Sequence, residues 1–297
     1  MSRFAILPIT ICVYEIVSLI LPLKISVWAK ILCALILMSG LAKIFAIVRT
    51  PTGFDLFVIV AVFMLLIKDA FFIAWKIFSR VPFPHHNASL FVFSVALCAT
   101  LYGTYQGLKV PDVKTHEVSI ENLGKDLDGM KIAMLVDIHA DNLTDKDVVR
   151  AIVDKTNSLE PDLILIPGDF VDGQVKTRSA DLRPIENLKT RYGVYGSTGN
   201  HEYYFDYEGW IKEIKNFGVR LLENEHITIT SGDSKLILAG IPDITGAQMG
   251  LVAPDIKLAL KDIPEDVPVI LMDHRPEFAR ENAKHNVALQ VSGHTHG

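Results

Sequence analysis

Short groups of carboxylate, imidazole and amide side chains recur in the second half of this sequence, each just after an apolar run. In chain order they are Asp137-Ile138-His139, Gly168-Asp169-Phe170-Val171-Asp172, Gly199-Asn200-His201-Glu202, Asp273-His274 and Gly293-His294-Thr295-His296. Oxygen and imidazole donors without thiolates suit Mn, Fe or Zn at a hydrolytic centre. Any one group is weak evidence, because Gly-Asp is a common turn dipeptide. The ordered set, each member following a strand-like run, predicts a metal centre at the carboxyl ends of strands.

The spacing of these donors indicates how they would bind ions. On an extended chain, residues two apart point to the same side. We therefore expect Asp137 and His139 to bind one ion together, and His294 and His296 to share that geometry. Asp169 has two carboxylate oxygens and can bridge two ions. Two ions about 3.5–4 Å apart can hold both the attacking and the leaving oxygen of a displacement at phosphorus.

The elements that must position these residues form an α/β pattern, in which short apolar runs alternate with amphipathic stretches. One helix is expected to follow Thr144 as its N-cap. A second is expected from Tyr207 to Phe217, with Gly218 ending it. The expected strands are Lys131–Asp137, Asp162–Ile166, Gly193–Ser197, Lys235–Gly240, Val267–Met272 and Ala288–Ser292.

The first 108 residues differ from the rest in being strongly apolar, and half of all 297 residues are hydrophobic. A membrane-spanning helix needs about 20 apolar residues. Runs of that length are Phe4–Leu23, Val27–Val48, Phe54–Trp75 and Ser89–Leu108. We predict that residues 1–108 form a bundle of four transmembrane helices and that residues 109–297 form a separate α/β domain. Lys and Arg are balanced between the two sides of the bundle, so they do not predict which side the domain faces.

Charge also divides the chain near residue 108. Residues 1–108 contain 8 Lys and Arg against 3 Asp and Glu, whereas residues 109–297 contain 21 against 31. Sequence-independent binding to nucleic acid depends on Lys and Arg at phosphates. A domain with a net charge of −10 is therefore not expected to bind nucleic acid. The lipid bilayer is the partner expected for the apolar first 108 residues, and a phosphate-ester substrate would need its charge met locally, by metal ions or a small basic pocket.

The ordered groups Asp-x-His, Gly-Asp-x-x-Asp, Gly-Asn-His-Glu, His and Gly-His-x-His resemble those of the calcineurin-like metallophosphoesterase superfamily. The resemblance extends from about Lys131 to Gly297. Within the superfamily the chain is similar to a membrane-associated bacterial branch, on the stretches Leu127–Ile132, Pro161–Ile164 and Ser292–Gly297. The resemblance implies two mixed β-sheets flanked by helices and two divalent metal ions, which are Mn, Fe or Zn. Relatives continue beyond this point, so we expect the domain to be truncated at its C-terminus.

The same resemblance implies a role for each site residue. One ion would be bound by Asp137, His139, Asp169 and His296. Asp169 would bridge to the second ion, which is completed by Asn200, His274 and His294. A hydroxide between the ions would attack phosphorus in line, and His201 would protonate the leaving oxygen or stabilise the transition-state charge. Asp172 would hold and polarise His201, and Glu202 is expected to be structural.

These expectations favour a membrane-anchored hydrolase of a phosphodiester or a diphosphate, with a lipid-linked substrate as the narrower hypothesis. We expect it in a bacterial cytoplasmic membrane. One alternative is a membrane sensor or scaffold whose domain binds metal without turnover, but His201 and Asp172 are not needed merely to hold metal. Another is a transporter with a regulatory domain. It ranks last because the spans contain few polar residues and no broken-helix signal.

Overall fold

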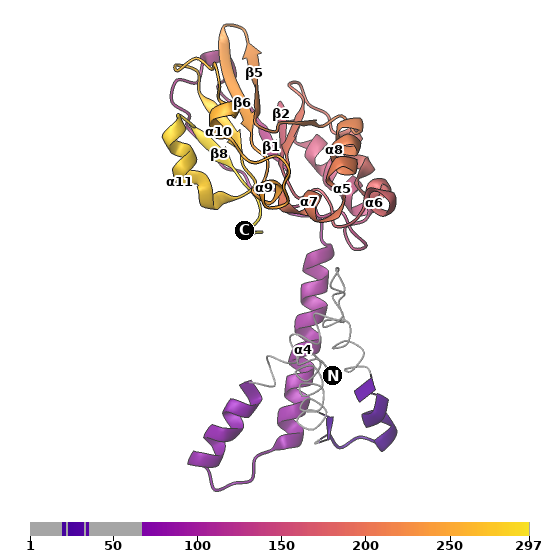
Figure 1. Ribbon diagram of the computed structural model, residues 1–297. Helices are drawn as coiled ribbons and strands as arrows, with labels where there is room; N and C mark the ends of the chain where they lie inside the picture. Colours follow the sequence, from indigo (N-terminus) through magenta and orange to yellow (C-terminus); the bar gives the residue numbers. More distant parts are fainter. Residues whose placement is uncertain (1–19, 22, 33, 36–66, 297) are drawn as a thin grey trace. The chain divides into compact units, whose positions relative to one another are not determined.

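The computed structural model describes residues 20–21, 23–32, 34–35 and 67–296 (Figure 1). The chain divides into two compact units, Met1–Lys109 and Val110–Gly297.

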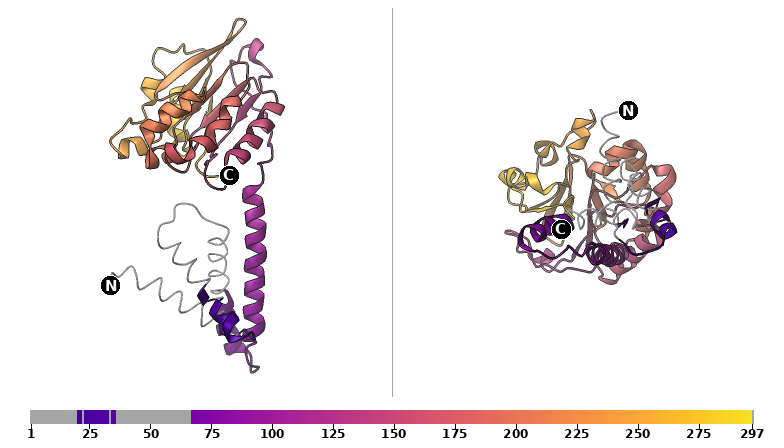
Figure 2. Two further views of the ribbon diagram at one scale, coloured as in Figure 1. Left: turned by 90° about the vertical axis from the view of Figure 1, so that its right-hand side faces the viewer. Right: turned by 90° about the horizontal axis from the view of Figure 1, so that it is seen from below.

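In the first unit, α4 spans His85–Leu108, and Figure 2 shows it as one long helix. Within the described part of the chain, only its segment His85–Gly103 has the length and the mean hydropathy, 1.3, of a membrane span. This segment overlaps the fourth expected span. Residues 27–32, 34–35 and 67–78 are also helical. The first three expected spans lie largely outside the described residues.

The second unit contains a four-stranded sheet in the order β1-β2-β3-β4. Its strands are β1 Ile132–Met134, β2 Leu163–Pro167, β3 Val194–Ser197 and β4 Arg220–Leu221. All three pairings are parallel. We expected two mixed sheets, and for the described strands of this sheet that expectation was wrong. Every residue of β2 is buried, as a continuous apolar run predicts for a parallel strand covered on both faces.

A second sheet, in the order β5-β6-β7-β8, is mixed as expected. Its strands are β5 Glu225–Ser231, β6 Ser234–Gly240, β7 Val269–Met272 and β8 Leu289–Val291. The β5–β6 pair is antiparallel and the other two pairs are parallel. Leu236 and Leu238 of β6 pack with Leu163 and Leu165 of β2. The inner faces of the two sheets therefore share one apolar core.

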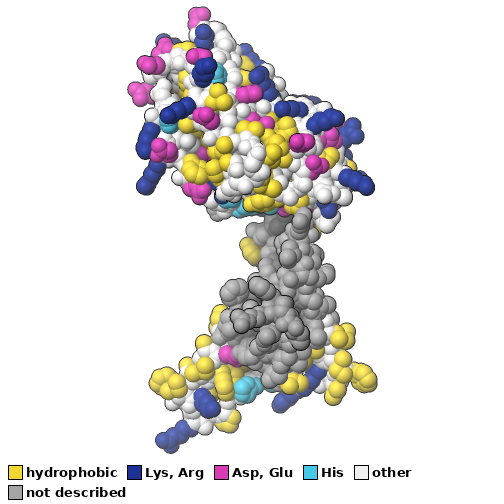
Figure 3. Space-filling view, in the orientation of Figure 1, with side chains coloured by type: hydrophobic (Ala, Val, Ile, Leu, Met, Phe, Trp, Pro, Cys, Tyr) yellow, Lys and Arg dark blue, Asp and Glu magenta, His cyan; other side chains and the backbone are white. Residues whose placement is uncertain are grey.

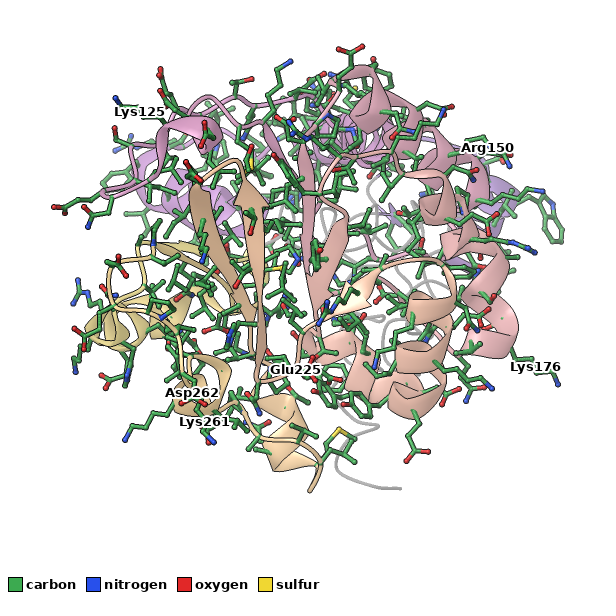
Figure 4. The ribbon with its side chains drawn as sticks, turned by 90° about the horizontal axis from the view of Figure 1, so that it is seen from above. Lys125, Arg150, Lys176, Glu225, Lys261 and Asp262 are labelled. Atoms are coloured by element: carbon green, nitrogen blue, oxygen red, sulfur yellow. The ribbon has the colours of Figure 1, made fainter. Side chains whose placement is uncertain are left out.

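Helices cover the outer faces of both sheets, and Figure 4 shows the sheets between them. On the first sheet, a cluster that includes Trp210 and Phe170 fills the space beneath the helices. Charged side chains such as Arg150 and Lys176 point outward. The helices of this unit are α5 Lys146–Ser158, α6 Val175–Leu182, α7 Asn200–Phe205, α8 Tyr207–Asn216, α9 Thr245–Gln248, α10 Ile256–Ala259 and α11 Ala279–Asn282. Short 3-10 turns lie at Lys125–Leu127, Arg183–Asn187, Pro276–Phe278 and Ala283–His285.

The start of α5 differs by one residue from the expectation. Asp145, and not Thr144, is the N-cap, and its side chain accepts the N–H groups of Asp147 and Val148. The first-turn N–H groups of a helix lack internal partners, and a carboxylate also interacts favourably with the positive end of the helix dipole. Two adjacent residues of good capping type left this choice open in the sequence.

Candidate metal centre

The predicted site residues all follow strands of the two sheets, at the carboxyl ends of those strands. Asp137 and His139 follow β1, Asp169 and Asp172 follow β2, Asn200 and His201 follow β3, His274 follows β7, and His294 and His296 follow β8. The structure brings all of them except Asn200 into three groups of potential metal ligands, whose ligand atoms lie within 4.8 Å of one another. These are Asp137, His139 and His296; His139, Asp172 and His201; and Asp169, His274 and His294.

The backbone that presents these side chains is not the extended chain that we expected. Strand β1 ends at Met134, and the φ angles of Asp137 and His139 are +51° and +45°. His294 and His296 are likewise left-handed, with φ angles of +71° and +57°. Such angles are uncommon for residues other than glycine and cost of order 1–3 kcal/mol each. Asp137 and His139 still lie in one cluster, as the spacing predicts, but His294 and His296 do not: His296 joins Asp137, whereas His294 joins Asp169 and His274, the division that the family resemblance implies.

The first cluster is formed by Asp137, His139 and His296. The rings of His139 and His296 are stacked, with centroids 5.0 Å apart and an interplanar angle of 21°. Oδ1 of Asp137 accepts the backbone N–H of His294 at 3.0 Å, which joins the loop after β1 to the loop after β8. Nε2 of His139 is buried and has no hydrogen-bond partner among the described residues. A buried polar atom normally has a partner, so this lone pair is available to an ion.

Asp169, His274 and His294 form the second cluster, and Asp169 also faces the first. Its Oδ2 is 3.4 Å from Nε2 of His139 and 3.2 Å from Nε2 of His274. Ligands on one ion with bonds of about 2.1 Å are separated by roughly these distances. Oδ1 of Asn200 lies 3.2 Å from the same nitrogen of His274. The position of Asp169 thus fits a ligand that bridges two ions. The position of Asn200 fits a further ligand of the second cluster.

His274 is fully buried and is oriented by the backbone of the first sheet. Its Nδ1 donates to the carbonyl of Pro167 at 2.8 Å, which leaves Nε2 to face Asp169. Burial opposes protonation of the ring, but the hydrogen bond and the negative charge of Asp169 outweigh it and raise the pKa of His274 to about 9. The site therefore attracts positive charge at Nε2, which an ion can supply in place of a proton.

Asp172 contacts two imidazoles, although we expected it to hold only His201. Its Oδ1 lies 2.9 Å from Nδ1 of His139 and also accepts a hydrogen bond from Nδ1 of His201. Burial opposes ionisation of Asp172, but these contacts outweigh it and hold its pKa well below the usual range. Because a carboxylate only accepts, both rings carry their hydrogen on Nδ1 and direct Nε2 into the site. Nε2 of His201 lies 4.0 Å from Oδ2 of Asp169.

Glu202 joins the loops after β2 and β3, which fits the structural role expected for it. Its carboxylate accepts the backbone N–H groups of Gly199 at 2.8 Å, Asp169 at 3.1 Å and Phe170 at 2.8 Å. Burial and the nearby charge of Asp169 raise the pKa of Glu202 to about 7, against the effect of the N–H donors. Gly168 has a φ of +92°, and a Cβ there would lie 2.5 Å from the nitrogen of Gly199. Only glycine allows this close approach of the two loops.

Two polar residues beside the centre were not singled out from the sequence. Arg275 follows His274 directly, and its guanidinium contacts both Asp243 and His294. Its position next to His274, a predicted metal ligand, could have identified Arg275 from the sequence. Asp243 lies in the segment after β6 and had no such signal, since none of the recurring groups includes it.

The donor set fits two divalent ions. The carboxylates and imidazoles lack thiolates, their separations match shared coordination, and one buried imidazole nitrogen has no partner among the described residues. Oxygen and nitrogen ligands of this kind suit Mn, Fe or Zn, among which the geometry does not choose.

The fold and the site define a protein of the metallophosphoesterase class. The family model of the calcineurin-like phosphoesterases matches residues 130–297, and the chain belongs to that family. This confirms the resemblance found in the sequence.

Three relatives illustrate the similarity. A "transmembrane protein with metallophosphoesterase domain" from Danio rerio is 31% identical over 215 residues, covering 69% of this chain and 49% of that protein. An uncharacterised metallophosphoesterase from Helicobacter pylori is 36% identical over 195 residues, covering 65% and 51%. YkuE, a metallophosphoesterase from Bacillus subtilis, is 26% identical over 202 residues, covering 66% and 69%. The chain spans about half the length of the first two relatives.

Proposed function

We propose that this protein is a metal-dependent phosphoesterase that hydrolyses a phosphodiester or a diphosphate bond. The observation that supports this most directly is the position of Asp169, whose Oδ2 lies 3.4 Å and 3.2 Å from imidazole nitrogens of two separate clusters. Two divalent ions at such a site supply the positive charge that polarises the phosphoryl group and lowers the pKa of the attacking water. Asp137, His139 and His296 would hold one ion, Asn200, His274 and His294 the other, and Asp169 both.

His201 is the proposed general acid. Burial opposes its protonation, but the hydrogen bond to Asp172 and the charge of Asp169 outweigh it and raise the pKa of His201. With its Nδ1 directed to Asp172, the ring presents Nε2 toward Asp169, where it can give a proton to the leaving oxygen. Asp172 fixes the orientation of this ring.

The narrower proposal is an integral membrane protein, in a bacterial cytoplasmic membrane, that acts on a lipid-linked substrate. It is supported by the candidate span in α4. A second support is a set of exposed apolar side chains in the unit that contains the site. Tyr204 is exposed and its ring lies 5.4 Å from that of His201, while Met249, Leu251 and Val252 are exposed in the loop after α9. Figure 3 shows apolar side chains gathered on the face of this unit that carries α9.

The test of the reaction is hydrolysis of a chromogenic phosphodiester by the full chain in detergent with added Mn²⁺. We expect turnover by the parent and loss of turnover in Asp169→Asn. His201→Gln should lower kcat by about 10²–10⁴-fold while Mn²⁺ remains bound. His116→Ala changes an exposed histidine and serves as the matched control. Mn²⁺ binding without turnover in the parent would instead indicate a membrane sensor or scaffold with a non-catalytic domain.

The lipid-linked substrate has a separate test. Turnover of a water-soluble diester is compared with that of a diphosphate that carries an acyl or isoprenoid chain, for the parent and for Met249→Ser combined with Leu251→Ser. We expect the parent to prefer the lipid-linked compound and the double variant to lose that preference through KM. Equal turnover of both substrates by the parent contradicts this part of the proposal.

A further inference from the structure

The guanidinium of Arg275 is held beside the second cluster by a buried carboxylate. Nε donates to Oδ2 of Asp243 at 2.7 Å and Nη2 lies 3.4 Å from Oδ1 of the same residue, with Oγ1 of Thr245 also at 3.4 Å. The side chain of Asp243 is fully buried and that of Arg275 is 17% exposed. These contacts occupy one edge of the guanidinium plane and leave Nη1 on the side of His294.

Nη1 of Arg275 lies 3.2 Å from Nε2 of His294. Since arginine only donates, this contact requires a lone pair on Nε2 of the imidazole. A neutral imidazole has one lone pair and one N–H. If His294 gives its lone pair to an ion, its other ring nitrogen carries the hydrogen and cannot accept from Arg275. Metal binding by His294 and the contact with Arg275 are therefore mutually exclusive.

The consequence is a free donor beside the loaded centre. The contacts with Asp243 do not involve His294, so they remain when the ion is bound. Arg275 then presents Nη1, with no acceptor on His294, beside a ligand of the ion that would bind the phosphoryl group. An arginine N–H and a phosphate oxygen form a charge-assisted hydrogen bond, which is about twice as strong as a neutral one.

We propose that Nη1 of Arg275 binds a non-bridging oxygen of the substrate phosphoryl group once His294 has bound its ion, and that Asp243 is the positioning residue for this arginine. The inference rests on the proposed function, which it deepens by assigning the residue that recognises the phosphoryl oxygen.

A purely structural role for Arg275 explains only part of the geometry. Its contacts with Asp243 and Thr245 join the segment after β6 to the loop after β7. They do not require a donor directed at a metal ligand. The backbone of Arg275 is held independently, because its N–H donates to Asp273 and its carbonyl accepts from Gln290. These backbone hydrogen bonds do not depend on the side chain, whereas Arg275→Gln also removes the ion pair of the buried Asp243.

The test measures binding and needs no turnover. The full chain in detergent is loaded with Mn²⁺, and the dissociation constant of inorganic phosphate is measured by calorimetry, together with the Mn²⁺ content. Arg275→Gln should weaken phosphate binding by about 10- to 100-fold without loss of Mn²⁺. Arg275→Lys should recover part of the affinity, and Asp243→Asn should weaken it through loss of positioning. Arg280→Gln, an exposed arginine in the same region, is the matched control.

The outcomes separate this inference from the proposed function. Phosphate affinity that does not change in Arg275→Gln, or that falls only in proportion to lost Mn²⁺, overturns the inference even if the parent hydrolyses diesters. If the parent shows no turnover but its phosphate affinity depends on Arg275, the inference is supported and the proposed enzymatic function is contradicted. A parent that binds no Mn²⁺ contradicts both the inference and the proposed function, because each requires a bound ion.

Discussion

The carboxylate of Glu202 accepts the backbone N–H of Asp169 at 3.1 Å, and so holds the residue that faces both clusters of potential metal ligands. Two further N–H groups, of Gly199 and Phe170, donate to the same carboxylate. The loops after β2 and β3 are thereby tied together beneath the site. Asp169 has a φ of +53°, and these hydrogen bonds stabilise that conformation.

Replacing Glu202 with Gln should weaken both the fold and the metal centre. Both carboxylate oxygens accept backbone N–H groups, so the amide NH₂ of glutamine must face at least one N–H. We expect a loss of about 1–3 kcal/mol in the free energy of unfolding and a fall of about 10- to 100-fold in Mn²⁺ affinity. Denaturant unfolding and Mn²⁺ titration check this, with exposed Glu208→Gln as the control. If the variant has the unfolding free energy and the Mn²⁺ affinity of the parent, the hydrogen bonds of Glu202 are not needed for either.

The division of His294 and His296 between clusters predicts different effects of two double variants. Asn200→Ala with His294→Ala removes two ligands of the second cluster, so about one ion should remain tightly bound. His294→Ala with His296→Ala removes one ligand from each cluster and should weaken both ions. Mn²⁺ content after competition with a chelator measures the difference. Equal retention by the two variants would mean that the histidines serve a single ion.

Capping of α5 predicts a difference between two neighbouring residues. Asp145→Ala removes the side chain that accepts the N–H groups of Asp147 and Val148, and should lower the free energy of unfolding by about 0.5–2 kcal/mol. Thr144→Ala leaves those hydrogen bonds in place and is the matched control. Denaturant unfolding distinguishes them. The reverse order of effects would restore Thr144 as the N-cap.

Glu223 gives a pH dependence of stability that does not involve the metal centre. Burial raises its pKa, although the hydrogen bond from Tyr207 and the charge of Lys215 oppose the rise. The folded protein therefore binds this proton more tightly than the unfolded chain does. The resulting stabilisation is complete below the ordinary glutamate pKa of 4.5 and is lost as the pH rises through the folded value.

Glu223→Gln mimics the protonated form and removes this dependence. Relative to the parent, the variant should gain stability as the pH increases from about 4 to about 7, within the window that a raised pKa opens. Unfolding in denaturant at several pH values measures the gain, and Glu117→Gln at an exposed position is the control. A difference between variant and parent that stays constant with pH contradicts the prediction.

Much of the fold could be predicted because its strands are apolar runs of ordinary length. Strands β2, β3 and β6 lie within two residues of the expected bounds. Two strands were missed for different reasons. Strand β4 has only two residues, and β5, Glu225–Ser231, is an edge strand with polar side chains at many positions. Neither forms the apolar run by which a buried strand is recognised.

By itself, the sequence determined the identity and the order of the site residues and the family to which the chain belongs, because donor chemistry depends on residue type and motifs on local spacing. How the backbone brings these residues together was decided only by the tertiary structure. Asp137 contacts the backbone of His294 across 157 positions, and His274 contacts Pro167 across 107. Left-handed backbone turns, set by these long-range contacts, direct His294 and His296 to different clusters. Spacing along a chain does not specify such turns, since they depend on contacts with residues far away in the sequence.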